Sequence, residues 1–284
     1  MNKNLTLNGA GMTAFEGDDV THVIFILDRS GSMSGKEADV IGGFNSYIDA
    51  LRANPDGQVG VSYVCFDGKL ELVWGDLPLA DVPRMTPDTY SVRGSTALLD
   101  AFGMTVSAVQ ENDAHRYIVI THTDGQENAS REWTADRVKS LIEQRETKGN
   151  WTFAFFGEGI DAWSQASRYG FSAGSSMAYA KDDLRPVYAA KGRVSNVMRT
   201  RKMAATKDFA AAASAIIQDP EISDEAVATI LRDGRPDSQE PEDSAMPTPK
   251  FGGGNTTPGY RRFGSTTPEH GYRGKEIRRD GRSR

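Results

Sequence analysis

Five oxygen-bearing side chains stand in three short segments that are far apart along the chain. Asp28, Ser30 and Ser32 form an Asp-x-Ser-x-Ser segment, and Thr96 and Asp124 come from two later segments. Hard divalent cations such as Mg²⁺ take oxygen ligands, so this set is suited to hold one of them. Two carboxylates neutralise such an ion and little more, while hydroxyl groups add ligands without adding charge. The ion would therefore still accept a further carboxylate from outside the chain.

Two of these segments follow short apolar runs that predict buried strands. Val23–Leu27 directly precedes Asp28, and Tyr117–Thr121 lies just before Asp124. Strand and helix patterns alternate through this part of the chain, which predicts an α/β fold: a Rossmann-like, doubly wound, mainly parallel sheet with helices on both faces. In such sheets ligands bind at the carboxyl ends of the strands, and both carboxylates fall at such ends.

One strand of the sheet is expected to be antiparallel. Val59–Phe66 and Leu70–Trp74 are strand-like, and Asp67-Gly68 between them is a hairpin turn signal, so we expect an antiparallel edge strand. Trp151–Phe156 and Ser176–Ala180 predict further strands. Helical spacing of apolar residues covers residues 36–53, 96–110, 134–147, 161–169 and 182–201.

The same patterns divide the chain into four parts. Residues 1–20 are polar and Gly-rich and predict an N-terminal arm, and residues 21–203 hold the α/β domain. Residues 204–232 predict a helical extension, and residues 233–284 are of low complexity, which predicts a flexible tail that cannot fold alone. Residues 250–284 contain nine Lys or Arg and three acidic residues, which gives this segment a net charge of +6. Because the whole chain has a net charge of −6, the rest of the chain carries −12.

Several classes of protein find no support in the composition. No apolar run approaches the roughly 20 residues of a membrane span, and the start lacks the apolar core of a signal peptide. Cys65 is the only cysteine, which suits a reducing compartment. We therefore expect a cytoplasmic protein. Neither a Gly-x-Ser-x-Gly elbow nor a phosphate-binding Gly-x4-Gly-Lys-Ser/Thr occurs, so we expect no enzyme.

The three segments closely resemble the von Willebrand factor A domain and its metal-ion-dependent adhesion site. The family motif is Asp-x-Ser-x-Ser, a distant Thr and a later Thr-Asp-Gly. In this chain the last part of the motif is Thr123-Asp124-Gly125. The resemblance covers roughly residues 20–200, and the motif segments are most similar to those of stand-alone bacterial and bacteriophage members. It therefore implies a protein of the cytoplasm of a bacterial or phage-infected cell, or a component of a virion. It implies that Mg²⁺, or Mn²⁺ or Ca²⁺, is bound and that an acidic residue of a partner protein completes its coordination, generally without catalysis. The implied metal ligands are Asp28, Ser30, Ser32, Thr96 and Asp124.

Residues beside the site are expected to form a rim that contacts the partner, although solvated loops are the competing interpretation. These rim residues are Arg29, Met33, Arg93, Glu127 and Asn128.

A second hypothesis is a structural protein of a bacteriophage particle or another large assembly, in which the arm and the tail bind neighbours. A metal-dependent phosphoesterase is a third. Aromatic residues among the arginines of the tail leave nucleic acid open as a further partner, whereas no membrane is expected.

Overall fold

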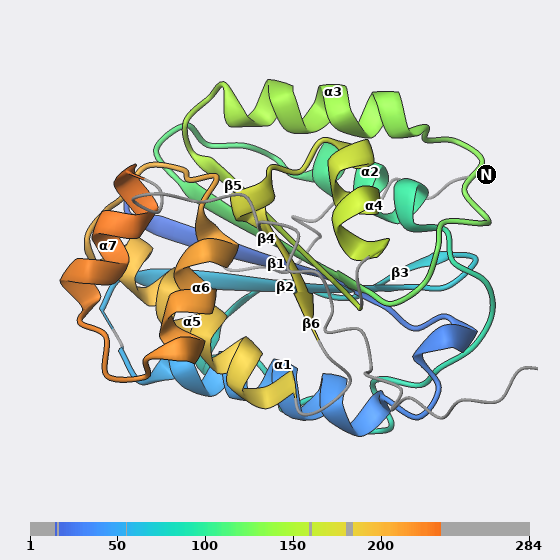
Figure 1. Ribbon diagram of the computed structural model, residues 1–284, viewed down its shortest axis with the longest axis horizontal. Coiled ribbons are helices and arrows are strands. Elements are labelled where there is room, and N and C mark those ends of the chain that lie inside the picture. Colours follow the sequence, from blue (N-terminus) through green and yellow to red (C-terminus); the bar gives the residue numbers. More distant parts are fainter. Residues whose placement is uncertain (1–14, 16, 55, 159–160, 180–183, 234–284) are drawn as a thin grey trace, which may run out of the picture. The chain divides into compact units, whose positions relative to one another are not determined.

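The computed structural model describes Phe15 and residues 17–54, 56–158, 161–179 and 184–233. These residues form a six-stranded sheet in the order β3-β2-β1-β4-β5-β6 (Figure 1). Neighbouring strands run parallel, except that β2 and β3 are antiparallel. The predicted α/β sheet with one antiparallel edge strand is therefore confirmed. The strands are β1 (Val20–Asp28), β2 (Gln58–Phe66), β3 (Leu70–Pro78), β4 (Arg116–Thr123), β5 (Trp151–Glu158) and β6 (Ser176–Tyr179).

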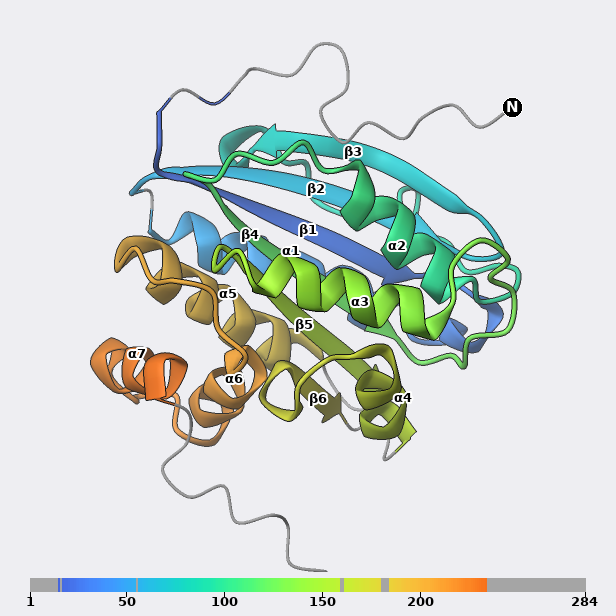
Figure 2. The ribbon, with the colours of Figure 1, turned by 90° about the horizontal axis from the view of Figure 1, so that it is seen from above.

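Helices cover both faces of this sheet (Figures 1 and 2). One layer holds α2 (Leu98–Ala108), α3 (Ala135–Glu146) and α4 (Asp161–Tyr169). The opposite layer holds α1 (Glu37–Arg52), α5 (Leu184–Thr200) and α6 (Phe209–Gln218), and α7 (Asp224–Asp233) packs beside α6. None of the helices in the described ranges combines the length and the apolar character that a membrane span requires.

The central strand β1 separates two hydrophobic cores. Val23, Phe25 and Leu27 belong to the core beneath α1 and α5, and Ile24 and Ile26 belong to the core beneath α2 and α3. All five are buried, as expected for a strand of a parallel sheet that is covered on both faces. The apolar run in the sequence thus reflects burial on two sides.

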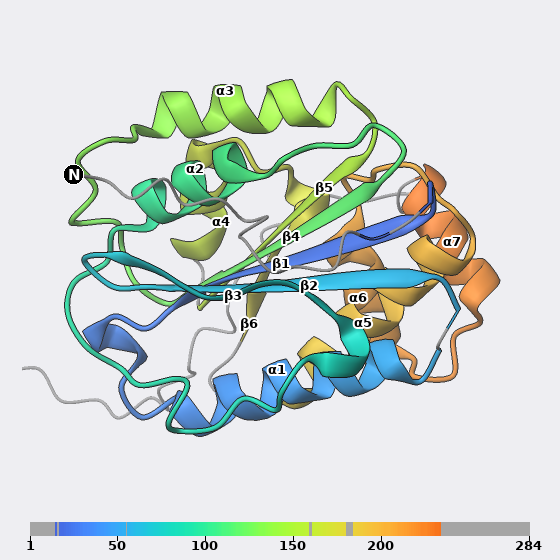
Figure 3. The same cartoon turned by 180° about the vertical axis from the view of Figure 1, so that it is seen from behind.

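The strand order reverses between β1 and β4, and this reversal positions the site. From β1 the chain passes through α1 to β2 and β3 on one side, then through α2 to β4 on the other side (Figure 3). The register pairs Leu27 with His122, so the two strands end side by side. Asp28 is the last residue of β1, and Asp124 follows Thr123 at the end of β4. Both carboxylates therefore lie at the switch point, where such sheets bind ligands.

The region expected as a helical extension shares the core of the α/β domain. Phe209 and Ala213 of α6 and Val227 of α7 are fully buried in the same cluster as Phe25 of β1. The predicted arm and tail fall almost entirely on residues 1–14, 16 and 234–284, which lie outside the described residues, as does the predicted start of α5 within residues 180–183.

Candidate metal centre

Side-chain oxygens from two of the three segments approach Gly125, which lies in the third segment just beyond the end of β4. A Cβ atom built on this glycine would lie 2.9 Å from Ser32 Oγ, 2.9 Å from Thr96 Oγ1 and 3.3 Å from Asp28 Oδ2. Ser30 Oγ lies 3.0 Å from Ser32 Oγ. The residue at this position must therefore be glycine, because any side chain would fill the space that the oxygens enclose.

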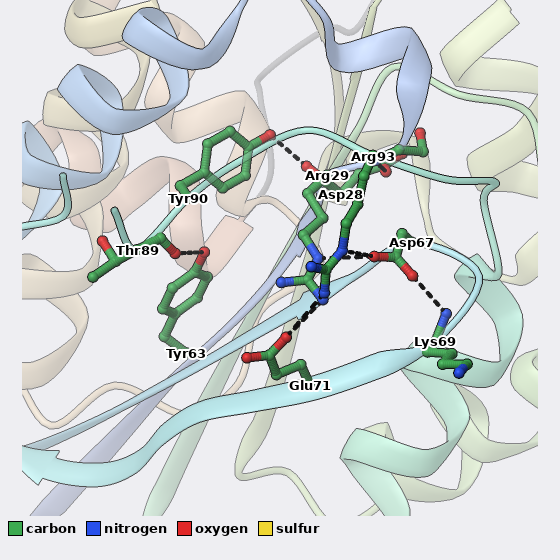
Figure 4. Close-up of polar contacts among 10 residues, drawn as sticks. Asp28, Arg29, Tyr63, Asp67, Lys69, Glu71, Thr89, Tyr90 and Arg93 are labelled. Atoms are coloured by element: carbon green, nitrogen blue, oxygen red, sulfur yellow. Dashed lines mark hydrogen bonds and ion pairs between the residues drawn. The ribbon is translucent and has the colours of Figure 1, made fainter. Parts of the chain in front are cut away.

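Asp28 is fully buried, and its carboxylate is held from two sides. Oδ1 accepts a hydrogen bond from the Ser30 backbone N–H at 2.6 Å, and Oδ2 accepts one from the Thr123 hydroxyl at 2.5 Å. The Tyr90 hydroxyl donates to the Asp28 carbonyl at 2.6 Å (Figure 4). Burial raises the pKa of the Asp28 carboxyl, although the hydrogen bonds from Thr123 and Ser30 lower it in part. A nearby cation would stabilise the buried carboxylate.

Asp124 contributes a second carboxylate whose side chain is only 2 % exposed. Its Oδ2 forms an ion pair with the Lys36 ammonium group. Its Oδ1 is buried and has no hydrogen-bond partner within the described part of the chain. A buried carboxylate oxygen without a hydrogen-bond partner destabilises the fold. Its presence next to Gly125 therefore indicates a place where a cation can bind.

The donor set suits a hard divalent cation. It consists of two carboxylates and three hydroxyls, and nowhere in the described ranges do three His, Cys, Asp or Glu side chains gather as a metal group. Mg²⁺ and similar ions accept carboxylate, hydroxyl and water oxygens, whereas softer metals favour imidazole and thiolate ligands. The unpartnered Asp124 oxygen, the narrow space at Gly125 and the oxygen-only donors therefore fit such an ion.

Asp67, in the turn between β2 and β3, joins the loops that carry the site (Figure 4). Its Oδ2 accepts hydrogen bonds from Arg29 Nε at 3.1 Å and from Arg93 Nε at 2.9 Å. Its carbonyl accepts one from the Ala97 N–H at 2.9 Å. Arg29 belongs to the loop after β1, and Arg93 and Ala97 lie on either side of Thr96. Asp67 thus fixes two ligand-bearing loops relative to each other.

The loop after β4 is braced against the Thr96 segment and the start of α2. Asn128 Oδ1 accepts a hydrogen bond from the Thr96 N–H at 2.9 Å, and the Asn128 N–H donates to the Thr96 carbonyl at 3.0 Å. The Glu127 carboxylate accepts one from the Leu99 N–H at 2.9 Å and one from the Ser130 hydroxyl at 2.7 Å. These contacts hold the loop that contains Gly125 close to the threonine.

The five residues expected on the rim occupy different environments. Met33 is fully buried within a short 3-10 helix, Gly31–Met33, so it offers no surface to a partner. Arg29 is 6 % exposed because its guanidinium group is paired with carboxylates of the hairpin. The side chains of Glu127 and Asn128 accept hydrogen bonds from backbone N–H groups of the same chain. Arg93, with a side chain that is 61 % exposed, and the exposed Asn128 face solvent.

Three residues that touch the site were not among the expected site residues. Thr123 stands in the Thr-Asp-Gly segment, where its position beside a carboxylate is a usable signal. Asp67 follows a strand that runs parallel to β1, so its turn lies at the same edge of the sheet. Lys36 carries no such signal, because the reach of a lysine toward Asp124 depends on how the chain folds after Ser32.

Comparison with known proteins adds to this geometry. Neither models of protein families nor curated proteins match the sequence. Among solved structures, the von Willebrand factor domain of the type V pili tip protein Mfa5 from Porphyromonas gingivalis is similar, with a TM-score of 0.50 and 10 % identity. That match covers 62 % of this chain and 95 % of the Mfa5 domain.

Two other similar structures are longer proteins. The von Willebrand factor type A protein from Catenulispora acidiphila matches with a TM-score of 0.45 and 15 % identity over 62 % of this chain and 42 % of that one. Proximal thread matrix protein 1 from the mussel byssus matches with a TM-score of 0.45 and 18 % identity over 62 % and 46 %. The chain thus spans less than half the length of either protein. The Mfa5 match and the sheet order show that the chain has a von Willebrand factor A fold.

Proposed function

We propose that this chain binds a divalent cation of the Mg²⁺ type and uses it to bind an acidic side chain of a partner protein. The observation that carries the proposal is the approach of oxygens of Asp28, Ser32 and Thr96, from two distant segments, to within 3.3 Å of one point at Gly125 in the third segment. The buried Asp124 Oδ1, which has no hydrogen-bond partner among the described residues, supports a cation there. The proposed ligands are Asp28, Ser30, Ser32, Thr96 and Asp124.

The side chains of the proposed site would have different roles in binding the ion. Asp28 and Asp124 supply the negative charge, and the hydroxyls fill further positions without adding charge. Thr123 holds the Asp28 carboxylate through its hydrogen bond to Oδ2. When bound, the ion supplies a coordination position that an outside carboxylate can occupy. The side chain of Arg93 is 61 % exposed, but its charge is paired with Asp67 and Glu71, so the attraction for an acidic partner would come mainly from the ion.

Two serines of one loop provide a matched test of metal binding. Ser32 is a proposed ligand, whereas Ser34 is exposed two residues later. We expect Ser32→Ala to weaken Mn²⁺ or Mg²⁺ binding by roughly 10- to 100-fold, a loss seen even for residues that only support metal ligands, and Ser34→Ala to leave it unchanged. Isothermal titration calorimetry measures both. Equal affinities in the two variants would contradict the ligand assignment.

The partner-binding part needs a separate measurement. The immobilised full chain should capture a protein from a lysate of its own source in the presence of Mg²⁺, and release it when a chelator is added. An Asp28→Ala variant should not capture that protein in Mg²⁺. Capture that survives both the chelator and Asp28→Ala would rule out a metal-bridged contact. It would not contradict the proposal that the chain binds a metal.

A further inference from the structure

The candidate metal centre already contains a positive charge that belongs to the chain. The Lys36 ammonium group forms an ion pair with Asp124 Oδ2, and the two side chains are 17 % and 2 % exposed. Lys36 lies directly before α1, and its backbone N–H donates to the Met33 carbonyl at 3.0 Å. The loop that supplies Ser30 and Ser32 therefore also supplies this cation.

The ion pair has a physical reason. A buried carboxylate is costly unless an opposite charge faces it, and Asp124 has only one oxygen paired within the described residues. Asp28 adds a second buried carboxylate to the same centre. Lys36 thus neutralises part of the charge that a divalent cation would neutralise. Both cations would draw on the single negative charge of Asp124, so each weakens the attraction of this carboxylate for the other.

We propose that Lys36 is a tethered counter-ion that competes with the divalent cation for Asp124. This inference rests on the proposed metal-dependent function and names the residue that sets the affinity of that site. The lysine stabilises the metal-free chain, and its ammonium group leaves Asp124 when metal binds. Because its side chain is already partly exposed, it can turn toward solvent, where its charge would lie close to an incoming acidic residue.

Replacing the lysine separates its two effects. Lys36→Met keeps the apolar stem and removes the charge. We expect it to tighten Mg²⁺ and Mn²⁺ binding by about 10-fold, which corresponds to about 1.4 kcal/mol. The midpoint of thermal unfolding without metal should fall, since Asp124 loses its counter-charge, and the increase on adding metal should be larger than in the wild type.

A second lysine at the same edge of the sheet controls for net charge. Lys69 is exposed in the turn between β2 and β3, where its backbone N–H donates to Asp67 Oδ1 at 2.9 Å. Lys69→Met removes the same charge, and we expect its metal affinity to stay within about twofold of the wild type, as for a screened surface charge. An equal gain in both variants would mean that general electrostatics acts, and would overturn the role of Lys36.

A measurement on the unaltered chain covers the case in which Lys36→Met does not fold. Limited acetylation followed by mass spectrometry should label Lys36 slowly without metal and faster with saturating Mg²⁺, while Lys69 labels at one rate. An unchanged or slower rate for Lys36 overturns the proposal.

The outcomes separate the two levels of inference. Metal binding that is unchanged or weaker in folded Lys36→Met, beside a wild type that binds metal, overturns the competition and leaves the proposed function standing. Failure of the folded wild type and of the folded variant to bind either ion overturns both. Binding by the variant alone supports the competition in its strongest form.

Discussion

At the residue scale, Asp67 shows how one carboxylate organises a site that it does not enter. Its Oδ2 faces both Arg29 and Arg93, and its Oδ1 accepts a hydrogen bond from the Lys69 N–H (Figure 4). Glu71 accepts a further hydrogen bond from Arg29 at 2.7 Å. The arginines flanking the site are therefore tied to the hairpin, and their charges are largely compensated before any partner arrives.

We expect Asp67→Asn to lower the free energy of unfolding by about 1–3 kcal/mol at neutral pH, because two arginines lose the charge they face. Burial raises the pKa of Asp67, but the hydrogen bond from Arg93 and the charge of Arg29 outweigh it and hold that pKa below 3.8. This stability is present above the ordinary pKa and is lost as pH falls through the lower folded-state pKa.

The difference between Asp67→Asn and the wild type should therefore stay constant near neutral pH and close only below pH 3.8. Urea unfolding over a pH series measures it. Asp88→Asn, at an exposed position, is the control and should change stability by less than about 0.5 kcal/mol. A difference that closes near pH 6 would point to another titrating group.

At the element scale, close packing of α1 against α5 supports the face of the sheet beneath the site. Gly192 of α5 lies against α1, since a Cβ built there would meet Ala50 Cβ at 2.7 Å and the Tyr47 carbonyl oxygen at 2.9 Å. A Cβ on Gly43 of α1 would meet the Tyr188 ring at 2.7 Å. Each glycine lets the helices approach where a methyl group would separate them.

Gly192→Ala should therefore lower the free energy of unfolding by about 1–3 kcal/mol through overpacking. Gly42→Ala on α1 is the matched control, because its Cβ would meet only the flexible Arg185 side chain at 3.2 Å. Alanine is the better helix former, so we expect Gly42→Ala to be neutral or stabilising by up to about 1 kcal/mol. Denaturant unfolding compares the two, and the same sign in both would contradict the packing argument.

At the scale of the whole molecule, α6 and α7 complete a core that begins in the central strand. Phe209 and Val227 are fully buried in the cluster that contains Phe25 and Tyr47. Thr206 links this stretch to the sheet, because its backbone N–H donates to the Thr152 hydroxyl oxygen of β5 at 3.1 Å. The stretch after residue 203 therefore belongs to the folded core. The hypothesis of an assembly protein rests on the arm and the tail, which lie outside the described residues.

Two truncations test this organisation. A chain that ends at residue 233 should keep the thermal midpoint of the full chain. A chain that ends at residue 203 should lose its cooperative transition, because burial of each large apolar side chain of α6 and α7 contributes about 1.5–3 kcal/mol. Calorimetry distinguishes them. An unchanged transition in the shorter chain would show that the two helices are dispensable.

The sequence by itself determined the elements and the candidate ligands. Val23–Leu27 predicted a strand because burial on both faces requires an apolar run, and Asp67-Gly68 predicted the hairpin because its turn chemistry is local. The order of the three oxygen-bearing segments indicated a metal site at the strand ends. The bound metal and the partner stay predictions, to be decided by the titrations and the capture experiment.

Only the tertiary structure decided which charges meet. The pairing of Lys36 with Asp124, the two arginines on Asp67 and the burial of Met33 depend on side-chain reach across loops that are far apart in sequence. No periodicity records such contacts, because the distance between two side chains follows from the register of the strands and the packing of the helices. The tertiary structure therefore adds a competing cation to the oxygen ligands that the sequence predicted.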